Sequence, residues 1–182
     1  MKLVVTGTPA TGKTTLAKAL AKKAGAELIS INDFVKARKI GRKDRKGEIV
    51  VEPAALEKAL NAELKGKKGY VVEGHLACEI RLPADAVIVF RCDPVKLRAR
   101  YRKRGYSAEK SRENLLAEAL DYCLIKSEEA YGRGMVLQID ATRRRTPEDI
   151  LEAMRLWKSD RIEWGKQMLP GGRLSFLLSE RV

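Results

Sequence analysis

The sequence predicts an α/β fold in which a five-stranded parallel sheet is flanked by helices. Short runs rich in valine and isoleucine alternate with longer amphipathic stretches, an order typical of parallel sheets whose strands are buried on both faces. The runs that predict strands are residues 2–6, 27–30, 70–73, 86–91 and 135–140. A chain of 182 residues is long enough for one domain with a substantial core. We find no repeat or linker, so residues 1–182 are assigned to a single domain.

The stretches between these runs carry signals for helix starts. Residues 12–24 follow the first predicted strand and place apolar side chains along one face. Ser30 and Asp33 have the spacing of a capping box, which predicts a short helix directly after Ser30. Pro53 and Pro94 each suit the first position of a helix, where a missing N–H costs little.

The second half of the chain predicts two further helices and a tail. A long helix is expected over residues 107–131, with an inward-facing side formed by Leu116, Leu120, Cys123 and Leu124. Thr146 and Asp149 predict a second capping box, followed by an apolar stripe of Ile150, Met154 and Trp157. Residues 165–182 lose this order at a Pro-Gly-Gly sequence. The tail has no predicted role, and its apolar residues could pack on the domain or on a partner.

The charge balance predicts polyanionic partners. The chain has 37 lysines and arginines against 24 acidic residues, a formal net charge of +13. A surplus of this size favours nucleotides and, as a second class, RNA. The densest apolar run, residues 86–90, is far shorter than a membrane-spanning helix. We therefore expect no membrane contact and a location in the cytoplasm, or in the nucleus of a eukaryotic cell.

The cysteines indicate neither a disulfide framework nor a zinc site. The chain has three cysteines, Cys78, Cys92 and Cys123, which are widely spaced and form no C-x-x-C pair. We expect them to be small buried hydrophobic residues.

Residues 7–14 form a phosphate-binding motif. They read Gly-Thr-Pro-Ala-Thr-Gly-Lys-Thr and match G-x-x-x-x-G-K-[ST] in full, between a predicted strand and a predicted helix. Glycines let backbone N–H groups approach phosphate oxygens, and the helix N-terminus adds a favourable field. Lys13 is expected to reach the β- and γ-phosphates, Thr14 to bind Mg²⁺ and Thr15 to lie near the α-phosphate. The motif predicts a P-loop NTPase fold that uses ATP and Mg²⁺ for phosphoryl transfer.

A cluster of basic residues precedes Gly105 and Tyr106. Its members are Arg98, Arg100, Arg102, Lys103 and Arg104. Arginines at helical spacing beside a glycine suit a closing lid that stabilises charge on the transferring phosphoryl group. The alternative is a solvated basic helix face. The tetrapeptide N-K-x-D, which reads the base in GTPases, is absent from the sequence, and this favours a kinase.

The P-loop and three further stretches resemble the adenylate kinase isoenzyme 6 family, small adenylate-kinase-like ATPases of archaea and eukaryotes. Residues 7–15 resemble the family's GTPGxGKTT loop. The other stretches are Ile-Asn-Asp-Phe at 31–34, Glu-Gly-His at 73–75 and Arg-Gly-Tyr-Ser-Ala-Glu-Lys at 104–110. In that family they form the monophosphate-binding helix, a D-x-H element similar to Walker B, and an R-G-Y lid.

The resemblance implies a role for each matching residue. The residues implied to bind ATP are Gly7, Ala10, Gly12, Lys13, Thr14, Thr15, Arg104 and, against the adenine, Arg143 or Arg145. Those implied to act in catalysis are Lys13, Glu73, His75 and Arg104, with Thr14 and Glu73 at the metal. The acceptor candidates are Asn32, Asp33, Phe34 and Arg38. The monophosphate-binding segment would span residues 30–50 and the lid residues 103–113, and the strand order would be 2-3-1-4-5.

Three residues of this site carry a question about their conformation or role. Ala10 stands where the family usually has glycine, so its backbone must avoid the left-handed conformation or bear strain. Glu73 replaces the usual aspartate, and because an unpaired buried carboxylate is costly, a metal-site role is favoured over a surface salt bridge. His75 is the chain's one histidine. It follows a strand end, where α/β proteins bind ligands, although loop histidines are more often simple hydrogen-bonding groups.

The resemblance and the residues leave three functions open. The first is a nucleoside monophosphate kinase that converts ATP and AMP to two ADP and also hydrolyses ATP. The second is an ATP-driven assembly factor in small ribosomal subunit maturation, with a platform ribosomal protein and rRNA as the implied partners. The third is a kinase of another small metabolite such as shikimate, whose acceptor pocket would need arginines aimed at a carboxylate.

Overall fold

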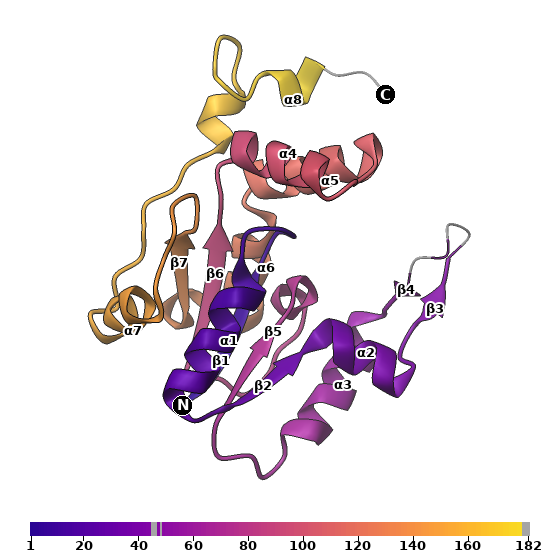
Figure 1. Ribbon diagram of the computed structural model, residues 1–182, viewed down its shortest axis with the longest axis vertical. Helices are drawn as coiled ribbons and strands as arrows, with labels where there is room; N and C mark the ends of the chain where they lie inside the picture. Colours follow the sequence, from indigo (N-terminus) through magenta and orange to yellow (C-terminus); the bar gives the residue numbers. More distant parts are fainter. Residues whose placement is uncertain (45–46, 48, 180–182) are drawn as a thin grey trace.

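A five-stranded parallel sheet forms the centre of the molecule, as the sequence predicts. The computed structural model describes residues 1–44, 47 and 49–179 (Figure 1). The strands of this sheet are β1 (Lys2–Gly7), β2 (Glu27–Ser30), β5 (Tyr70–Glu73), β6 (Ala86–Arg91) and β7 (Val136–Asp140). They are parallel and lie in the order β2-β5-β1-β6-β7. This is the predicted order 2-3-1-4-5, and the α/β P-loop fold class is confirmed.

Helices cover both faces of the sheet because alternate strand residues point to opposite sides. The helices are α1 (Lys13–Ala24), α2 (Ile31–Arg38), α3 (Pro53–Leu64), α4 (Pro94–Lys103), α5 (Ala108–Ala119), α6 (Tyr122–Tyr131), α7 (Pro147–Arg155) and α8 (Phe176–Ser179). The described residues also form the short 3₁₀ helices η1 (His75–Glu79), η2 (Arg133–Met135) and η3 (Gly165–Met168). Val4 of β1 belongs to the core under α3 and α6, whereas its neighbours Leu3 and Val5 belong to the core under α1 and α7.

The predicted long helix over residues 107–131 is wrong, because the chain breaks between α5 and α6. Asp121 lies at the break with a left-handed φ of 60°, and its carboxylate accepts a hydrogen bond from the buried Arg91. Because the chain changes direction at this break, Leu120, which was predicted to face inward, is 58% exposed. The other three residues of the predicted inward side, Leu116, Cys123 and Leu124, do pack against the cores.

The helix caps agree with the sequence in part. Thr146 and Asp149 form the predicted capping box, in which each backbone N–H donates to the other side chain. Pro53 and Pro94 occupy first helical positions as predicted. The capping box predicted at Ser30 is wrong, since the Ser30 side chain makes no capping hydrogen bond, although α2 begins directly after it.

The apolar stripe predicted for α7 is confirmed at Ile150, which is buried, and at Met154, which packs against the same core. It is wrong at Trp157. The helix ends at Arg155, and Trp157 has a φ of 49° and is 44% exposed.

The tail packs on its own domain. Met168, Leu174 and Leu177 are buried in an apolar cluster with residues of α4 and α5. Arg173 adds an ion pair to Asp93, the N-cap of α4, at 2.8 Å. The structure therefore places Met168, Leu174 and Leu177 of the tail against the α4–α5 pair. The three cysteines are free and buried, as expected.

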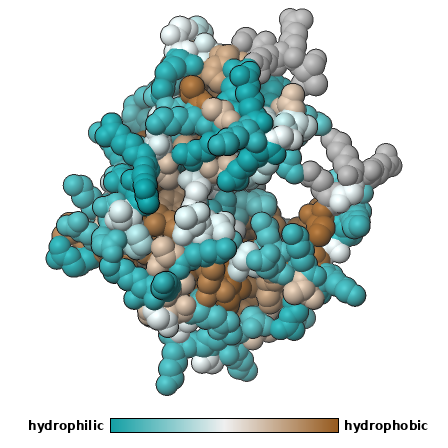
Figure 2. All heavy atoms as spheres, viewed as in Figure 1, coloured by the Kyte–Doolittle hydropathy of each residue, from teal (hydrophilic) through white to brown (hydrophobic). Residues whose placement is uncertain are grey.

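The segment over residues 30–50 contains α2 and a two-stranded antiparallel hairpin, β3 (Arg42–Lys43) with β4 (Ile49–Val50). Figure 1 shows the hairpin projecting from the body of the molecule. Residues 45, 46 and 48 of the predicted monophosphate-binding segment lie outside the described residues. Figure 2 shows a mostly hydrophilic face, with an open space between the hairpin and the body. Within the described part of the chain, no helix has the length and apolar composition that crossing a bilayer requires.

Candidate active site

The P-loop lies at the carboxyl end of the central strand, the position where open α/β sheets bind ligands. It connects β1 to α1, and its first residue, Gly7, has a φ of 133°. A Cβ atom at Gly7 would lie 2.3 Å from the carbonyl oxygen of Phe90, so only glycine fits there. Gly12 has a left-handed φ of 100° directly before α1. Two glycines of the motif are thus required by the backbone path.

Ala10 bears the backbone strain that the sequence left as one of two outcomes. Its φ is 65°, in the left-handed region that a Cβ atom disfavours. Two side chains of α4 hold the loop in this shape. Arg100 donates to the carbonyl oxygen of Ala10 at 2.9 Å, and the Tyr101 hydroxyl donates to that of Pro9 at 2.9 Å.

Replacing Ala10 with glycine is expected to raise the free energy of unfolding by about 0.5–1 kcal/mol, because glycine adopts the left-handed conformation at no steric cost. Urea unfolding followed by circular dichroism measures the change. The matched control is Ala62→Gly on the exposed face of α3, which is expected to lower stability by about 1 kcal/mol. A loss of stability in Ala10→Gly equal to that of the control would contradict the strain at Ala10.

Lys13 is folded into the bend of the P-loop. Its ammonium group donates to the carbonyl oxygen of Thr8 at 3.3 Å, and the hydroxyl of Thr11 donates to the same oxygen at 3.0 Å. Burial lowers the pKa of Lys13, an effect that the nearby carboxylate of Glu73 opposes. The loop thus holds a cation inside its bend, and backbone N–H groups together with such a cation are what bind phosphate in loops of this kind.

Thr14 and Glu73, the predicted metal-binding pair, meet at the end of β5. The Thr14 hydroxyl donates to Oε2 of Glu73 at 3.1 Å, and Glu73 is only 3% exposed. Hydroxyl and carboxylate oxygens are the ligands that Mg²⁺ prefers, and in ATP sites phosphate and water complete its coordination. The described residues contain no group of three or more histidine, cysteine or acidic side chains that could hold a metal. The pair therefore fits a metal ion that arrives with a nucleotide.

His75 lies two residues beyond Glu73, in η1. Its backbone carbonyl accepts hydrogen bonds from the Thr6 hydroxyl and the Cys78 thiol, both at 3.1 Å. Burial lowers the pKa of His75 to about 4, and the positive charges of Lys13 and Lys110 contribute. The imidazole is therefore uncharged at neutral pH, and it adds no positive charge near the P-loop.

The lowered pKa of His75 predicts a pH dependence of stability. The unfolded chain binds a proton at His75 near pH 6.5, whereas the folded protein does so only at about pH 4. Unfolding takes up this proton between the two values, so acidification through this window lowers the free energy of unfolding. His75→Gln, which does not titrate, is expected to show a shallower slope in urea unfolding from about pH 7 to about pH 4.5. Parallel slopes for the two proteins would contradict the lowered pKa.

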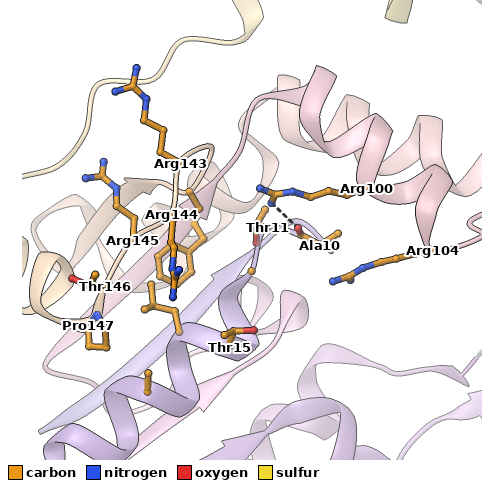
Figure 3. A pocket seen from close by; sticks show the side chains of 15 residues that line it. Ala10, Thr11, Thr15, Arg100, Arg104, Arg143, Arg144, Arg145, Thr146 and Pro147 are labelled. Carbon is orange, nitrogen blue, oxygen red and sulfur yellow. Dashed lines mark hydrogen bonds between the residues drawn. The ribbon is translucent and has the colours of Figure 1, made fainter.

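A cavity of about 510 Å³ lies beside the P-loop. It is lined by Ala10, Thr11, Gly12, Thr15, Leu16, Ala19, Phe90, Arg100, Arg104, Ala141, Arg143, Arg144, Arg145, Thr146 and Pro147. Five residues expected at ATP thus line one cavity: Ala10, Gly12, Thr15, Arg104 and Arg143. Figure 3 shows Arg100 and Arg104 reaching from α4 and its end toward the P-loop.

The sequence did not identify Arg144, one of the arginines that line this cavity. Arg144 points toward α1 in Figure 3, whereas its neighbour Arg143 points away from the P-loop. Arg145, the alternative for the adenine contact, also lines the cavity and is ion-paired with Asp160 at 2.7 Å. Arg100 was only one member of a basic run. Helical spacing shows which of these basic residues share a face of the helix, but it does not show which face lies against the P-loop.

A second cavity, of about 400 Å³, lies beside Thr14 of the P-loop. The predicted acceptor residues Asp33, Phe34 and Arg38 line it together with Thr14. The Arg38 guanidinium lies 5.7 Å from the centre of the Phe34 ring and is ion-paired with Glu63 at 2.6 Å. Asn32 is exposed and is not among the lining residues. The structure thus gathers three of the four acceptor candidates.

Known proteins share both the sequence pattern and the fold of this chain. A family model described as "AAA domain" matches residues 3–121. A relative named "Putative adenylate kinase" from Pyrococcus abyssi is 40% identical over 84% of this chain and 81% of its own length. A relative of the same name from Methanocaldococcus jannaschii is 33% identical over 90% and 93% of the two chains. The crystal structure of shikimate kinase from Bacteroides thetaiotaomicron, at 16% identity, has the same fold with a TM-score of 0.56 and covers 87% of this chain and 96% of that one. The chain therefore belongs to the adenylate-kinase-like family of P-loop proteins.

Proposed function

We propose that this protein is a nucleoside monophosphate kinase that transfers the γ-phosphoryl group of ATP to AMP and forms two ADP. The supporting observation is the placement of Thr14 and Thr15, adjacent P-loop residues that line different cavities. A donor in the larger cavity and an acceptor in the smaller one would meet at the P-loop, as in-line transfer requires. The names of the archaeal relatives favour the same activity.

The side chains suggest how the reaction is assisted. Lys13 would hold the β- and γ-phosphates with its buried ammonium group, and Arg100 and Arg104 would stabilise charge that develops on the transferred group. Thr14 and Glu73 would hold Mg²⁺, which when bound neutralises phosphate charge. His75, uncharged at neutral pH, would serve as a hydrogen-bonding group close to the reacting phosphate.

The acceptor is proposed to bind between Phe34, Arg38 and Asp33. Phe34 offers an aromatic face for a base, and Arg38 offers a guanidinium held beside it. We assign residues 30–50 as the monophosphate-binding segment and residues 103–113 as the lid. The lid begins at the C-terminal end of α4, turns at Gly105 with a φ of 69° and continues into α5. These assignments give the acceptor and donor cavities separate covering segments.

Product analysis tests the kinase directly. The purified protein is incubated with ATP and Mg²⁺, alone and with each nucleoside monophosphate or shikimate, and the nucleotides are resolved by chromatography. We expect ADP beyond the level of hydrolysis in the AMP reaction, with one AMP consumed per ATP. ADP formation that depends on shikimate, or on no acceptor at all, would contradict the proposal.

A second proposed function is ATP hydrolysis that drives small ribosomal subunit maturation, with a platform ribosomal protein and rRNA as partners. The hairpin favours this candidate, because it combines the exposed basic residues Arg42 and Lys43 with Ile49 and Val50, which are 45% and 47% exposed. The formal net charge of +13 also suits RNA. ATP loss that is indifferent to every monophosphate but stimulated by small-subunit RNA or protein would support this function over the kinase.

A further inference from the structure

Three consecutive residues of the P-loop are held by side chains of the α4–α5 pair. The carbonyl oxygens of Pro9 and Ala10 accept hydrogen bonds from Tyr101 and Arg100 of α4. Thr8 is held from α5, where its hydroxyl donates to Oε2 of Glu118 at 2.6 Å. Thr8 and Glu118 are separated by 110 positions in the chain, and the P-loop motif does not specify their contact.

Glu118 is held in one position because residues at the end of β6 donate to its other carboxylate oxygen, Oε1. Oε1 accepts from Nε of Arg91 at 2.8 Å and from the backbone N–H of Cys92 at 3.0 Å. The side chains of Arg91 and Glu118 are each 1% exposed. A buried ion pair that is also hydrogen-bonded keeps a single geometry, since any displacement leaves a charge without a partner.

Arg91 is itself held on several sides. Its guanidinium donates to the backbone carbonyl of Glu118 at 2.9 Å, to the amide oxygen of Gln138 at 3.2 Å and to the carboxylate of Asp121. These partners come from α5, from β7 and from the break between α5 and α6. These contacts therefore hold the Glu118 carboxylate in place independently of its hydrogen bond to Thr8.

Thr8 connects Glu118 to the phosphate-binding groups of the loop. Its side chain is bound to Glu118, while its carbonyl oxygen accepts from the Lys13 ammonium and from Thr11. A shift of Thr8 would move the partner of Lys13 and the adjoining N–H groups. We propose that Glu118 is a positioning residue that acts through the Thr8 hydroxyl and holds the P-loop in the shape that binds a nucleoside triphosphate. The inference rests on the proposed ATP site.

Isothermal titration calorimetry with ATP and Mg²⁺ tests this role in a Thr8→Val variant. Valine keeps the branched shape but removes the hydroxyl and leaves Oε2 of Glu118 without that donor. We expect the Kd for ATP to rise about tenfold, the factor that corresponds to one lost buried hydrogen bond. Thr8→Ser restores the donor and is expected to bind ATP within about twofold of the wild type.

A second variant separates positioning from stability. Ser127 is also fully buried, and its hydroxyl donates within α6 to the carbonyl oxygen of Cys123 at 2.7 Å. Both Ser127→Ala and Thr8→Val are expected to lower the Tm. Ser127→Ala, however, is expected to leave the Kd for ATP unchanged. If Thr8→Val does not fold, Thr8→Ala carries the same expectation without the added methyl group.

The outcomes distinguish this inference from the proposed function. Wild-type affinity in Thr8→Val, or an equal loss of affinity in Ser127→Ala, would overturn the positioning role while the ATP site stands. A wild-type protein that binds no ATP would overturn both. ATP binding that responds to Thr8→Val in a protein without AMP-dependent turnover would support the positioning role and overturn the kinase alone.

Discussion

A Lys13→Ala variant is expected to lose ATP turnover by about a hundredfold to a thousandfold, the scale seen when a hydrogen-bonding group that stabilises a transition state is removed. Lys13 is the one P-loop side chain that brings a full positive charge into the bend, where it donates to the carbonyl oxygen of Thr8. Backbone N–H groups, Arg100 and Arg104 would still face the phosphates, but the cation inside the bend of the loop would be lost. Both the AMP-dependent and the hydrolytic reactions are expected to fall together.

The measurement is the initial rate of ADP formation at saturating ATP, with and without AMP. Lys22→Ala is the matched control, since Lys22 is an exposed lysine in the last turn of the same helix and its removal is expected to leave the rate unchanged. The Lys13 variant should remain folded, because burial already disfavours the charged form of this side chain. A folded Lys13→Ala protein that turned over ATP normally would refute the site.

The largest expected effect on stability comes from Glu118→Ala, at about 3–5 kcal/mol. The substitution leaves the Arg91 guanidinium buried without its main counterion, and it removes the acceptor for the Thr8 hydroxyl and the Cys92 N–H. Removing one partner of a buried pair costs more than the pair contributes, because the remaining charge stays desolvated. Urea unfolding followed by circular dichroism should show an earlier midpoint.

An exposed ion pair supplies the comparison. Lys126 and Glu129 lie 2.7 Å apart on the surface of α6, and Glu129→Ala is expected to produce no measurable change, because solvent screens exposed pairs. The double variant Arg91→Met/Glu118→Leu removes both charges and is expected to recover much of the stability lost in Glu118→Ala. Equal effects of the Glu118 and Glu129 substitutions would show that the buried pair has no special role.

The sheet and most of the helices were predictable from local signals. The five strands were found because apolar runs in a parallel sheet are buried on both faces and carry no competing polar pattern. Pro53, Pro94 and the Thr146 capping box marked helix starts that the structure confirms. The break at Asp121 was not predicted, because the contact made there joins Asp121 to the buried guanidinium of Arg91, thirty positions away in the sequence.

The candidate site was predictable to a similar extent. Residues within the P-loop motif were identified because backbone geometry restricts what each position accepts, as at Gly7. Glu118 and Arg144 belong to no motif, and Arg100 was indistinguishable from its basic neighbours. Their roles depend on which face of α5, which turn after β7 and which face of α4 meet the P-loop.

The sequence by itself determined the P-loop and, through the family resemblance, the strand order and the pairing of Thr14 with Glu73 that we propose binds the metal. A motif with fixed spacing, or a set of stretches that resembles a known family, can be recognised in the sequence without coordinates. Only the tertiary structure decided that α4 and α5 hold residues 8–10 of the loop, that the tail packs on these helices and that Ala10 bears a left-handed backbone. Each of these features depends on contacts between segments that are distant in the sequence. The free energies of such contacts are set by burial and distance, which the residue types alone do not give.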